Sequence, residues 1–162
     1  MQQHVHRRGG AGRTILLAGF AAGFADYLYA TLRAVFAGGS AWGPWISVAR
    51  GLIGPAARDG GIEIALLGIA LHFFIMFGAA AIFYVVVKRL PWFARRPWVA
   101  GVLFGIGFLA VMNWVVLPLS HIGRPVYSGT TGLLNAAFLH IVLAGLPIAW
   151  TTTLRLRQMN RR

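Results

Sequence analysis

The 162-residue sequence contains no cysteine and only three acidic residues. Without cysteine the chain can form no disulfide, thiolate metal site, cysteine-ligated iron–sulfur cluster or covalently attached c-type haem. Charged residues of either sign make up 11% of the chain, against about 25% in an average soluble domain. The composition therefore argues against most classes of soluble protein and indicates a chain that lies largely in a membrane.

Four apolar runs account for most of the sequence, which is 58% hydrophobic. The clearest of them carries no formal charge between Glu63 and Lys88 apart from one histidine. At ~1.5 Å per residue such a helix crosses a hydrocarbon core of ~30 Å, and it satisfies its own backbone hydrogen bonds. We predict an all-α, polytopic membrane protein: one four-transmembrane-helix bundle over 14–154, with helices 14–36, 62–88, 98–120 and 130–154 and basic cytoplasmic tails over 1–13 and 155–162.

The segment between the first two predicted spans has an amphipathic pattern. Pro44 and Pro55 bracket it, and its apolar residues fall on one helical face. The pattern predicts a short helix over 45–54 that lies at the membrane interface, with Trp42 and Trp45 as anchors. A re-entrant segment or a lid over the bundle is the alternative.

The net charge of +12 has an uneven distribution along the chain. Eleven of the fifteen basic residues fall in 1–13, 88–96 and 155–162, which the predicted spans place on one side of the membrane. Basic residues accumulate on the cytoplasmic side, so we expect a bacterial inner-membrane protein with both termini in the cytoplasm. The expected partners of this charge are anionic lipid headgroups and not nucleic acid, because no basic and aromatic interleaving occurs outside the spans.

Three ionisable residues share one predicted depth in the membrane. Asp26, His72 and His140 each lie ten residues from the same end of the bundle, or ~15 Å at the helical rise. Asn113 lies slightly shallower, seven residues from that end. Ionisable groups at mid-membrane are costly and usually mark a functional site, so these four residues form the candidate site.

The candidate site fits three kinds of chemistry. Asp26, His72 and His140 could pass protons along a buried path, which favours proton-coupled transport, permeation or a role in acid stress. Alternatively, His72 and His140 could ligate a b-type haem or a metal ion in an electron-transfer subunit, with Asp26 orienting one imidazole. The same side chains could also serve only as hydrogen bonds between helices. No catalytic motif is present, which favours a protein that is not an enzyme and leaves the cofactor, haem b or none, open.

Two further patterns concern the ends and the faces of the helices. Arg33 and Glu63 lie near the same ends of adjacent antiparallel helices, where they could form an ion pair or a gate. Gly19 and Gly23, and likewise Gly101 and Gly105, form small-residue faces that admit another helix closely. These faces could seat a second copy or a partner, as in a homo-oligomer or a non-catalytic accessory subunit of a larger complex.

Four stretches resemble a family of uncharacterised short four-helix bacterial inner-membrane proteins. They are ARGLIGPA over 49–56, LLGIALHF over 66–73, MNWVVLPLS over 112–120 and GLP over 145–147. The resemblance covers most of the chain and includes the positions of Asp26, His72 and Asn113. Arg50 departs from the small residue expected there. A more distant likeness is to the YagU-like inner-membrane proteins linked with acid resistance. The resemblance implies a fold and a location, but no reaction.

Overall fold

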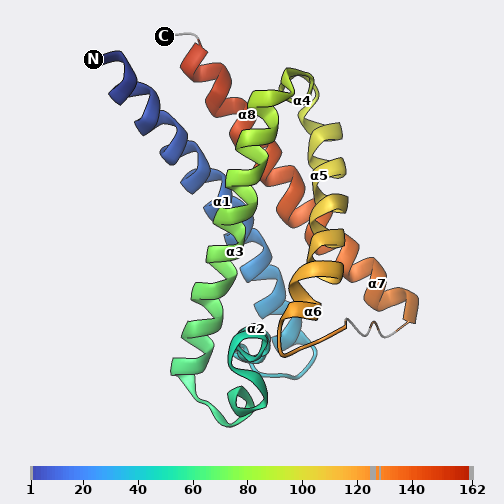
Figure 1. The fold of residues 1–162 in the computed structure, drawn as a ribbon. Coiled ribbons are helices and arrows are strands. Elements are labelled where there is room, and N and C mark those ends of the chain that lie inside the picture. The colour runs from blue at the N-terminus through green and yellow to red at the C-terminus, as the bar shows by residue number, and fades with distance from the viewer. Residues whose placement is uncertain (1, 125–126, 128, 161–162) are drawn as a thin grey trace.

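The computed structural model describes residues 2–124, 127 and 129–160, and these form helices and loops without a strand. Four helical segments, Gly10–Phe36, Ile62–Arg89, Pro97–Leu119 and Gly129–Asn160, are long and apolar enough to cross a membrane. They form an all-α bundle (Figure 1), as the sequence predicts. The elements are α1 (Gln2–Phe36), α2 (Gly43–Ile53), α3 (Ile62–Arg89), α4 (Pro91–Arg95), α5 (Pro97–Val111), α6 (Leu117–Leu119), α7 (Gly129–Phe138) and α8 (Leu146–Asn160), with a 3-10 helix over Gly54–Asp59.

The first and last helices are longer than predicted. The structure begins α1 at Gln2 and not at residue 14, and it continues α8 to Asn160 and not only to residue 154. The glycines before residue 14 lower helix propensity, but tertiary packing outweighs this effect. Gly10 lies against Met159 of α8, and the Thr14 hydroxyl donates a hydrogen bond to the Gly10 carbonyl at 2.7 Å.

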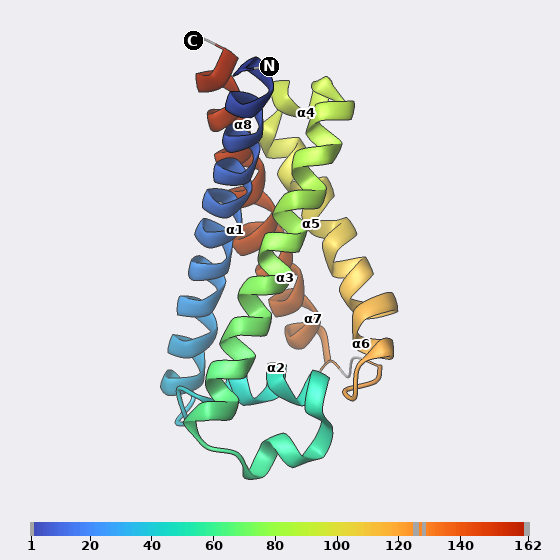
Figure 2. The same cartoon turned by 60° about the vertical axis from the view of Figure 1, so that its left-hand side comes forward.

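The two ends of the bundle differ in composition. Both ends of the described chain lie together with α4, at what we call the terminal end, and α2 lies across the opposite end, the α2 end (Figures 1 and 2). The described parts of the basic stretches predicted to share one side of the membrane therefore gather at the terminal end. Which side of the membrane this end faces stays a prediction.

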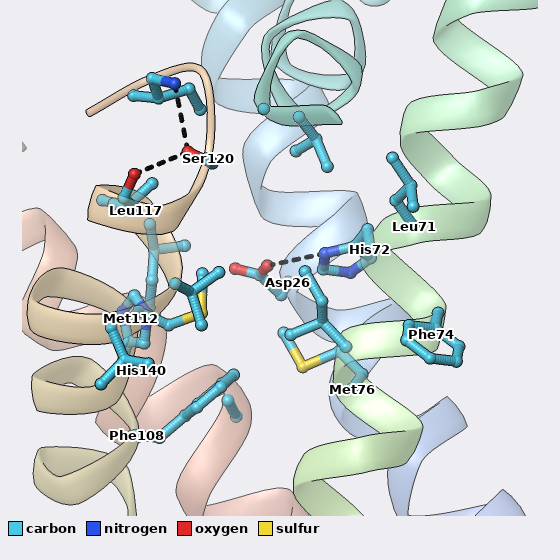
Figure 3. Close-up of a pocket in the computed structure, with 18 of the residues that line it drawn as sticks. Asp26, Leu71, His72, Phe74, Met76, Phe108, Met112, Leu117, Ser120 and His140 are labelled. Atoms are coloured by element: carbon cyan, nitrogen blue, oxygen red, sulfur yellow. Dashed lines mark hydrogen bonds and ion pairs between the residues drawn. The ribbon is translucent and has the colours of Figure 1, made fainter. Parts of the chain in front are cut away.

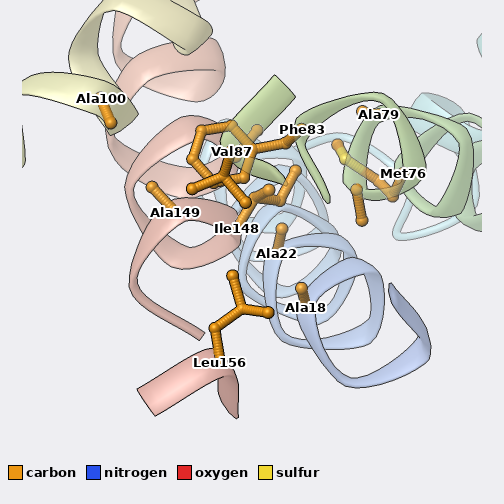
Figure 4. Close-up of a cluster of buried hydrophobic side chains, with 12 residues drawn as sticks. Ala18, Ala22, Met76, Ala79, Phe83, Val87, Ala100, Ile148, Ala149 and Leu156 are labelled. Carbon is orange, nitrogen blue, oxygen red and sulfur yellow. The ribbon is translucent and has the colours of Figure 1, made fainter. Parts of the chain in front are cut away.

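A buried apolar core lies on the terminal side of Asp26. There α1, α3 and α8 meet through small side chains, and Phe83 and Ile148 are fully buried among them (Figure 4). Alanines allow the helix backbones to approach closely, as they do in other membrane bundles. The buried cluster consists of Ala18, Ala22, Met76, Ala79, Ala80, Phe83, Val87, Ala100, Ala144, Ile148, Ala149 and Leu156.

The four glycines predicted to seat a partner pack instead against helices of the same chain. Gly19 and Gly23 lie against aromatic side chains of α3, and Gly101 and Gly105 lie against the last span. A Cβ atom added at Gly105 would lie 2.6 Å from the carbonyl oxygen of His140. These faces are therefore covered within the chain, and any association between copies must use another surface.

The helix between the first two spans forms, but its tryptophan is not an interfacial anchor. The Trp45 side chain is only 2% exposed, donates its indole N–H to the Thr31 hydroxyl at 3.1 Å and stacks on Tyr27. Its carbonyl lies directly over Gly68 of α3, where a Cβ atom would overlap it. The indole finds its hydrogen-bond acceptor inside the protein, so α2 docks between α1 and α3, which agrees with the alternative of a lid over the bundle. Trp42 stays 41% exposed.

Candidate functional site

Asp26 of α1 and His72 of α3 lie side by side in the middle of the bundle. Asp26 Oδ2 lies 3.7 Å from His72 Nδ1 (Figure 3), and the two side chains are 15% and 8% exposed. This is the ion pair that the described part of the chain contains. Two of the residues predicted to share one depth are thus brought together.

The backbone of α1 holds the other nitrogen of the imidazole. His72 Nε2 lies 3.0 Å from the carbonyl oxygen of Gly23, one helical turn before Asp26. Because a carbonyl oxygen only accepts hydrogen bonds, Nε2 carries a proton and donates it here. The rings of Trp45 and Phe73 lie edge-on to the imidazole, with centroids 5.2 and 5.4 Å away. The ring orientation is therefore fixed, with Nδ1 facing Asp26.

With Nε2 protonated, Asp26 and Nδ1 are the groups of the pair that can bind one further proton. The pair can be a neutral carboxyl beside a neutral imidazole, or a carboxylate beside an imidazolium, and its net charge is zero in both forms. Gaining a proton makes the pair positive, and losing one makes it negative. Two coupled groups of this kind titrate as a unit, so the pair is able to accept and release a proton without separating.

A cavity of about 590 Å³ adjoins the pair. Its walls contain Asp26, His72 and His140 together with apolar side chains of α2, α3, α5, α6 and the last span. Figure 3 shows Asp26 and His72 on one side of it and His140 on the opposite side. Asp26 Oδ1 is buried and has no hydrogen-bond partner among the described residues. Such an atom requires a partner, and the cavity is where that partner can bind.

His140 contributes the second imidazole. Its Nδ1 lies 2.8 Å from the carbonyl of Ala136, one turn earlier in the same helix, and so donates a proton there. The neutral ring then presents the lone pair of Nε2 as an acceptor. Its centroid lies 5.1 Å from that of Phe108 of α5. His140 is thus a second acceptor in the cavity wall and does not contact the Asp26–His72 pair in the way predicted from depth alone.

Two π-helical segments bring residues into the cavity wall. They span Met112–Val116 and Leu139–Gly145, and each ends just before a proline, Pro118 or Pro147. Proline lacks the N–H that the carbonyl four residues earlier would accept, and its ring clashes with that carbonyl. The helix widens locally as a result, a distortion that is frequent at functional sites. Met112 and His140 reach the cavity from these segments.

Three of the predicted site residues lie elsewhere. Asn113 accepts a hydrogen bond from the Tyr127 hydroxyl and is not part of the cavity wall. Arg33 and Glu63 are exposed and, within the described residues, do not come within 4.0 Å of each other. Glu63 instead accepts the backbone N–H of Gly61 at 2.9 Å. The outer ion pair is therefore not formed, because Glu63 finds its partner at the start of its own helix.

The geometry does not favour a haem or a metal ion between His72 and His140. An axial ligand needs an imidazole nitrogen whose lone pair is free. In His72, Nε2 donates to Gly23 and Nδ1 faces Asp26. His140 alone offers a suitable nitrogen. The described residues also contain no group of three or more histidine or acidic side chains placed to hold a metal. Ligation by both imidazoles would require His72 to leave its hydrogen bond to α1.

Some of the residues that build the site were missed at the sequence level. Trp45 was assigned to the membrane interface, although it packs on His72. The π segments that precede Pro118 and Pro147 were not predicted. A hydrogen-bonded tryptophan and threonine have no recognisable spacing in a sequence, whereas the two prolines inside predicted spans are a usable signal of local distortion.

Comparisons with known proteins add no relative. No family model, no curated protein and no solved structure matches this chain. The resemblance drawn from short stretches of sequence therefore stays a prediction. What the chain does has to be inferred from the Asp26–His72 pair and its cavity.

Proposed function

We propose that this membrane protein uses the Asp26–His72 pair to exchange protons with its cavity, and that this exchange drives the permeation of protons or the proton-coupled movement of a small molecule. One observation carries the proposal: Asp26 and His72 lie 3.7 Å apart in the wall of a 590 Å³ cavity, and Asp26 Oδ1 is buried without a hydrogen-bond partner among the described residues. An intramembrane ionisable pair of this kind is typical of proton pathways.

The asymmetry of the bundle supports a transport role. The cavity extends to the α2 end, where Gly51 and Leu52 of α2 and Ser120 after α6 line it. On the terminal side of the pair, α1, α3 and α8 form the packed core. The cavity thus gives the pair a route toward the α2 end, and a proton pathway needs such a route.

The element α2 is suited to respond to the protonation of His72. Trp45 contacts the imidazole from α2, while the Gly51 carbonyl accepts the His121 N–H at 3.0 Å from the loop after α6. A change of charge on the imidazole therefore acts directly on the helix that covers the α2 end. This contact gives a physical link between proton binding and opening of the cavity.

The test is a proton-flux assay in proteoliposomes that contain the full chain and a trapped pH-sensitive dye, under an imposed potassium diffusion potential. We expect the protein to raise the proton flux several-fold over empty vesicles and Asp26→Asn to return it to that baseline. Glu63→Gln is the matched control, because it removes the same charge from an exposed position outside the cavity. Equal flux in the wild type and Asp26→Asn would assign the pair a packing role only.

Infrared difference spectroscopy of the same samples follows the carboxyl directly. Exchange of protons between acidic and neutral buffer should produce a carboxyl band that disappears in Asp26→Asn and shifts in His72→Gln. If the difference spectrum of the wild type shows no such carboxyl band, Asp26 does not exchange its proton between the two buffers, and the proposal fails.

A further inference from the structure

The cavity beside Asp26 adjoins another cavity. This second cavity, of about 440 Å³, lies between α3 and α5 on the terminal side of the first. The two cavities share four wall residues, Ile75, Phe108, Met112 and Val116. We call the two adjoining cavities the slot; its walls extend from Ser120 near α2 to Phe93 of α4. Each part falls within the ~300–1,000 Å³ typical of sites for small organic ligands.

The slot exists because α3 and α5 are joined through α4 but diverge away from it (Figure 2). The second cavity is lined only by apolar side chains and glycines. Two of these glycines, Gly78 and Gly107, face open space, since a Cβ atom added to either would meet no other atom within 4 Å. The walls therefore leave room that the protein itself does not fill.

The polar end of the slot offers acceptors and not donors. Asp26 Oδ1 is an acceptor when the pair is a carboxylate beside an imidazolium, and also when a neutral carboxyl carries its proton on Oδ2. His140 Nε2 presents a lone pair, as argued above. The Ser120 hydroxyl is already engaged, since it donates to Leu117 at 2.8 Å and accepts from Ile122 at 3.1 Å. A ligand with an anionic or acceptor-only end would leave these atoms unpaired.

We propose that the slot binds an elongated, mainly apolar molecule that ends in a hydroxyl group, which donates its hydrogen bond to Asp26 Oδ1. The apolar part would occupy the second cavity, past Gly78 and Gly107. This inference adds a ligand class to the proposed function. It rests on that function only because Asp26 takes part both in proton exchange and in ligand binding. Two sources share the required chemistry: an isoprenoid alcohol and a quinol.

The first experiment measures equilibrium binding of tritiated farnesol to the full chain in lipid nanodiscs. We expect one saturable site. Farnesyl methyl ether, which keeps the chain but lacks the donor, should compete about tenfold less well, as befits loss of a hydrogen bond to a buried acceptor. Farnesoic acid should also compete poorly, because its carboxylate faces the Asp26 carboxyl. Equal competition by alcohol, ether and acid would overturn the proposed recognition of a hydroxyl group.

A glycine variant tests the location independently. A Cβ atom at Gly107 would meet no other atom within 4 Å, so in Gly107→Leu the bundle should remain folded while the side chain extends into the second cavity and farnesol binding falls at least tenfold. Gly12→Leu is the control, because a Cβ atom at Gly12 also meets no other atom within 4 Å and the position lies far from the slot. Unchanged binding in a folded Gly107→Leu protein would exclude the slot as the site.

Competition by decylubiquinol and decylubiquinone distinguishes the two sources. The quinol has hydroxyl donors and the quinone has none. Displacement of farnesol by the quinol alone would show that the site also binds a hydroxyl group on an aromatic head group. Displacement by neither would restrict the site to isoprenoid alcohols. Binding without proton flux would contradict only the proposed transport function, whereas flux without saturable binding would contradict only this inference.

Discussion

The backbone carbonyl of Gly23 accepts the Nε2–H of His72 at 3.0 Å, and this contact fixes which nitrogen of the imidazole faces Asp26. The orientation of the ring is thus determined by a main-chain atom of α1 and not by the carboxyl itself. Because Gly23 and Asp26 lie one turn apart, a single helix presents both partners of the imidazole. The arrangement should consequently survive removal of the charge at Asp26.

The hydrogen bond and the pair can be separated in stability measurements. His72→Ala leaves the Gly23 carbonyl and Asp26 Oδ2 without their partner, and we expect it to cost ~1–3 kcal/mol of unfolding free energy. Asp26→Asn, which retains the imidazole, should cost less. A double-mutant cycle in denaturant titrations should show coupling of ~0.5–3 kcal/mol between the two positions. Additive effects would mean that the 3.7 Å approach contributes no energy.

A methyl group at Gly68 should displace α2. In Gly68→Ala the new Cβ would overlap the Trp45 carbonyl, and overpacking of this kind costs ~1–3 kcal/mol. We expect faster proteolysis within 43–61 and a lower thermal midpoint. Gly78→Ala, in the same helix but facing open space, is the matched control. Equal behaviour of the two variants would show that α2 is not docked on α3.

The hydrogen bond of the buried Trp45 indole can be tested from its donor side and from its acceptor side. Trp45→Phe keeps an aromatic ring near Tyr27 and His72 but removes the donor to Thr31, which should cost ~0.5–1.5 kcal/mol. Thr31→Val removes the acceptor and should cost a similar amount. The double variant should cost less than the sum of the two, since both changes delete the same hydrogen bond. If Trp45 were an interfacial anchor, Thr31→Val would leave its fluorescence unchanged.

Pro147 should determine the position of His140 at a cost in stability. Pro147→Ala restores the missing N–H, so the π segment over Leu139–Gly145 can return to an α-helix and the bundle should become more resistant to heat. The same change turns His140 away from the cavity wall, and we expect farnesol binding to fall. Pro97→Ala is the control, because proline at the first position of a helix leaves no hydrogen bond unmade. Unchanged binding in Pro147→Ala would separate the π segment from the site.

Much of the architecture was accessible from the sequence, because hydropathy and length determine where a helix can cross a membrane. Depth along these helices also predicted that Asp26 and His72 would meet. Depth says nothing of rotation about the helix axis, so His140 was expected in the same cluster although it lies across the cavity. The glycine pairs of α1 and α5 correctly indicated close helix contacts, but one sequence cannot distinguish a helix of the same chain from one of another.

The apolar slot has a consequence for how selectivity arises inside a bilayer. Lipid tails are as apolar as the side chains of Leu103 or Ile82 that line the slot, so transferring a ligand's chain from the bilayer into the slot gains little free energy. Acyl chains also compete for the same space, and the relevant ligand concentration is its mole fraction in the membrane. Discrimination between molecules must therefore come almost entirely from the acceptor atoms of Asp26 and His140 at the polar end of the slot.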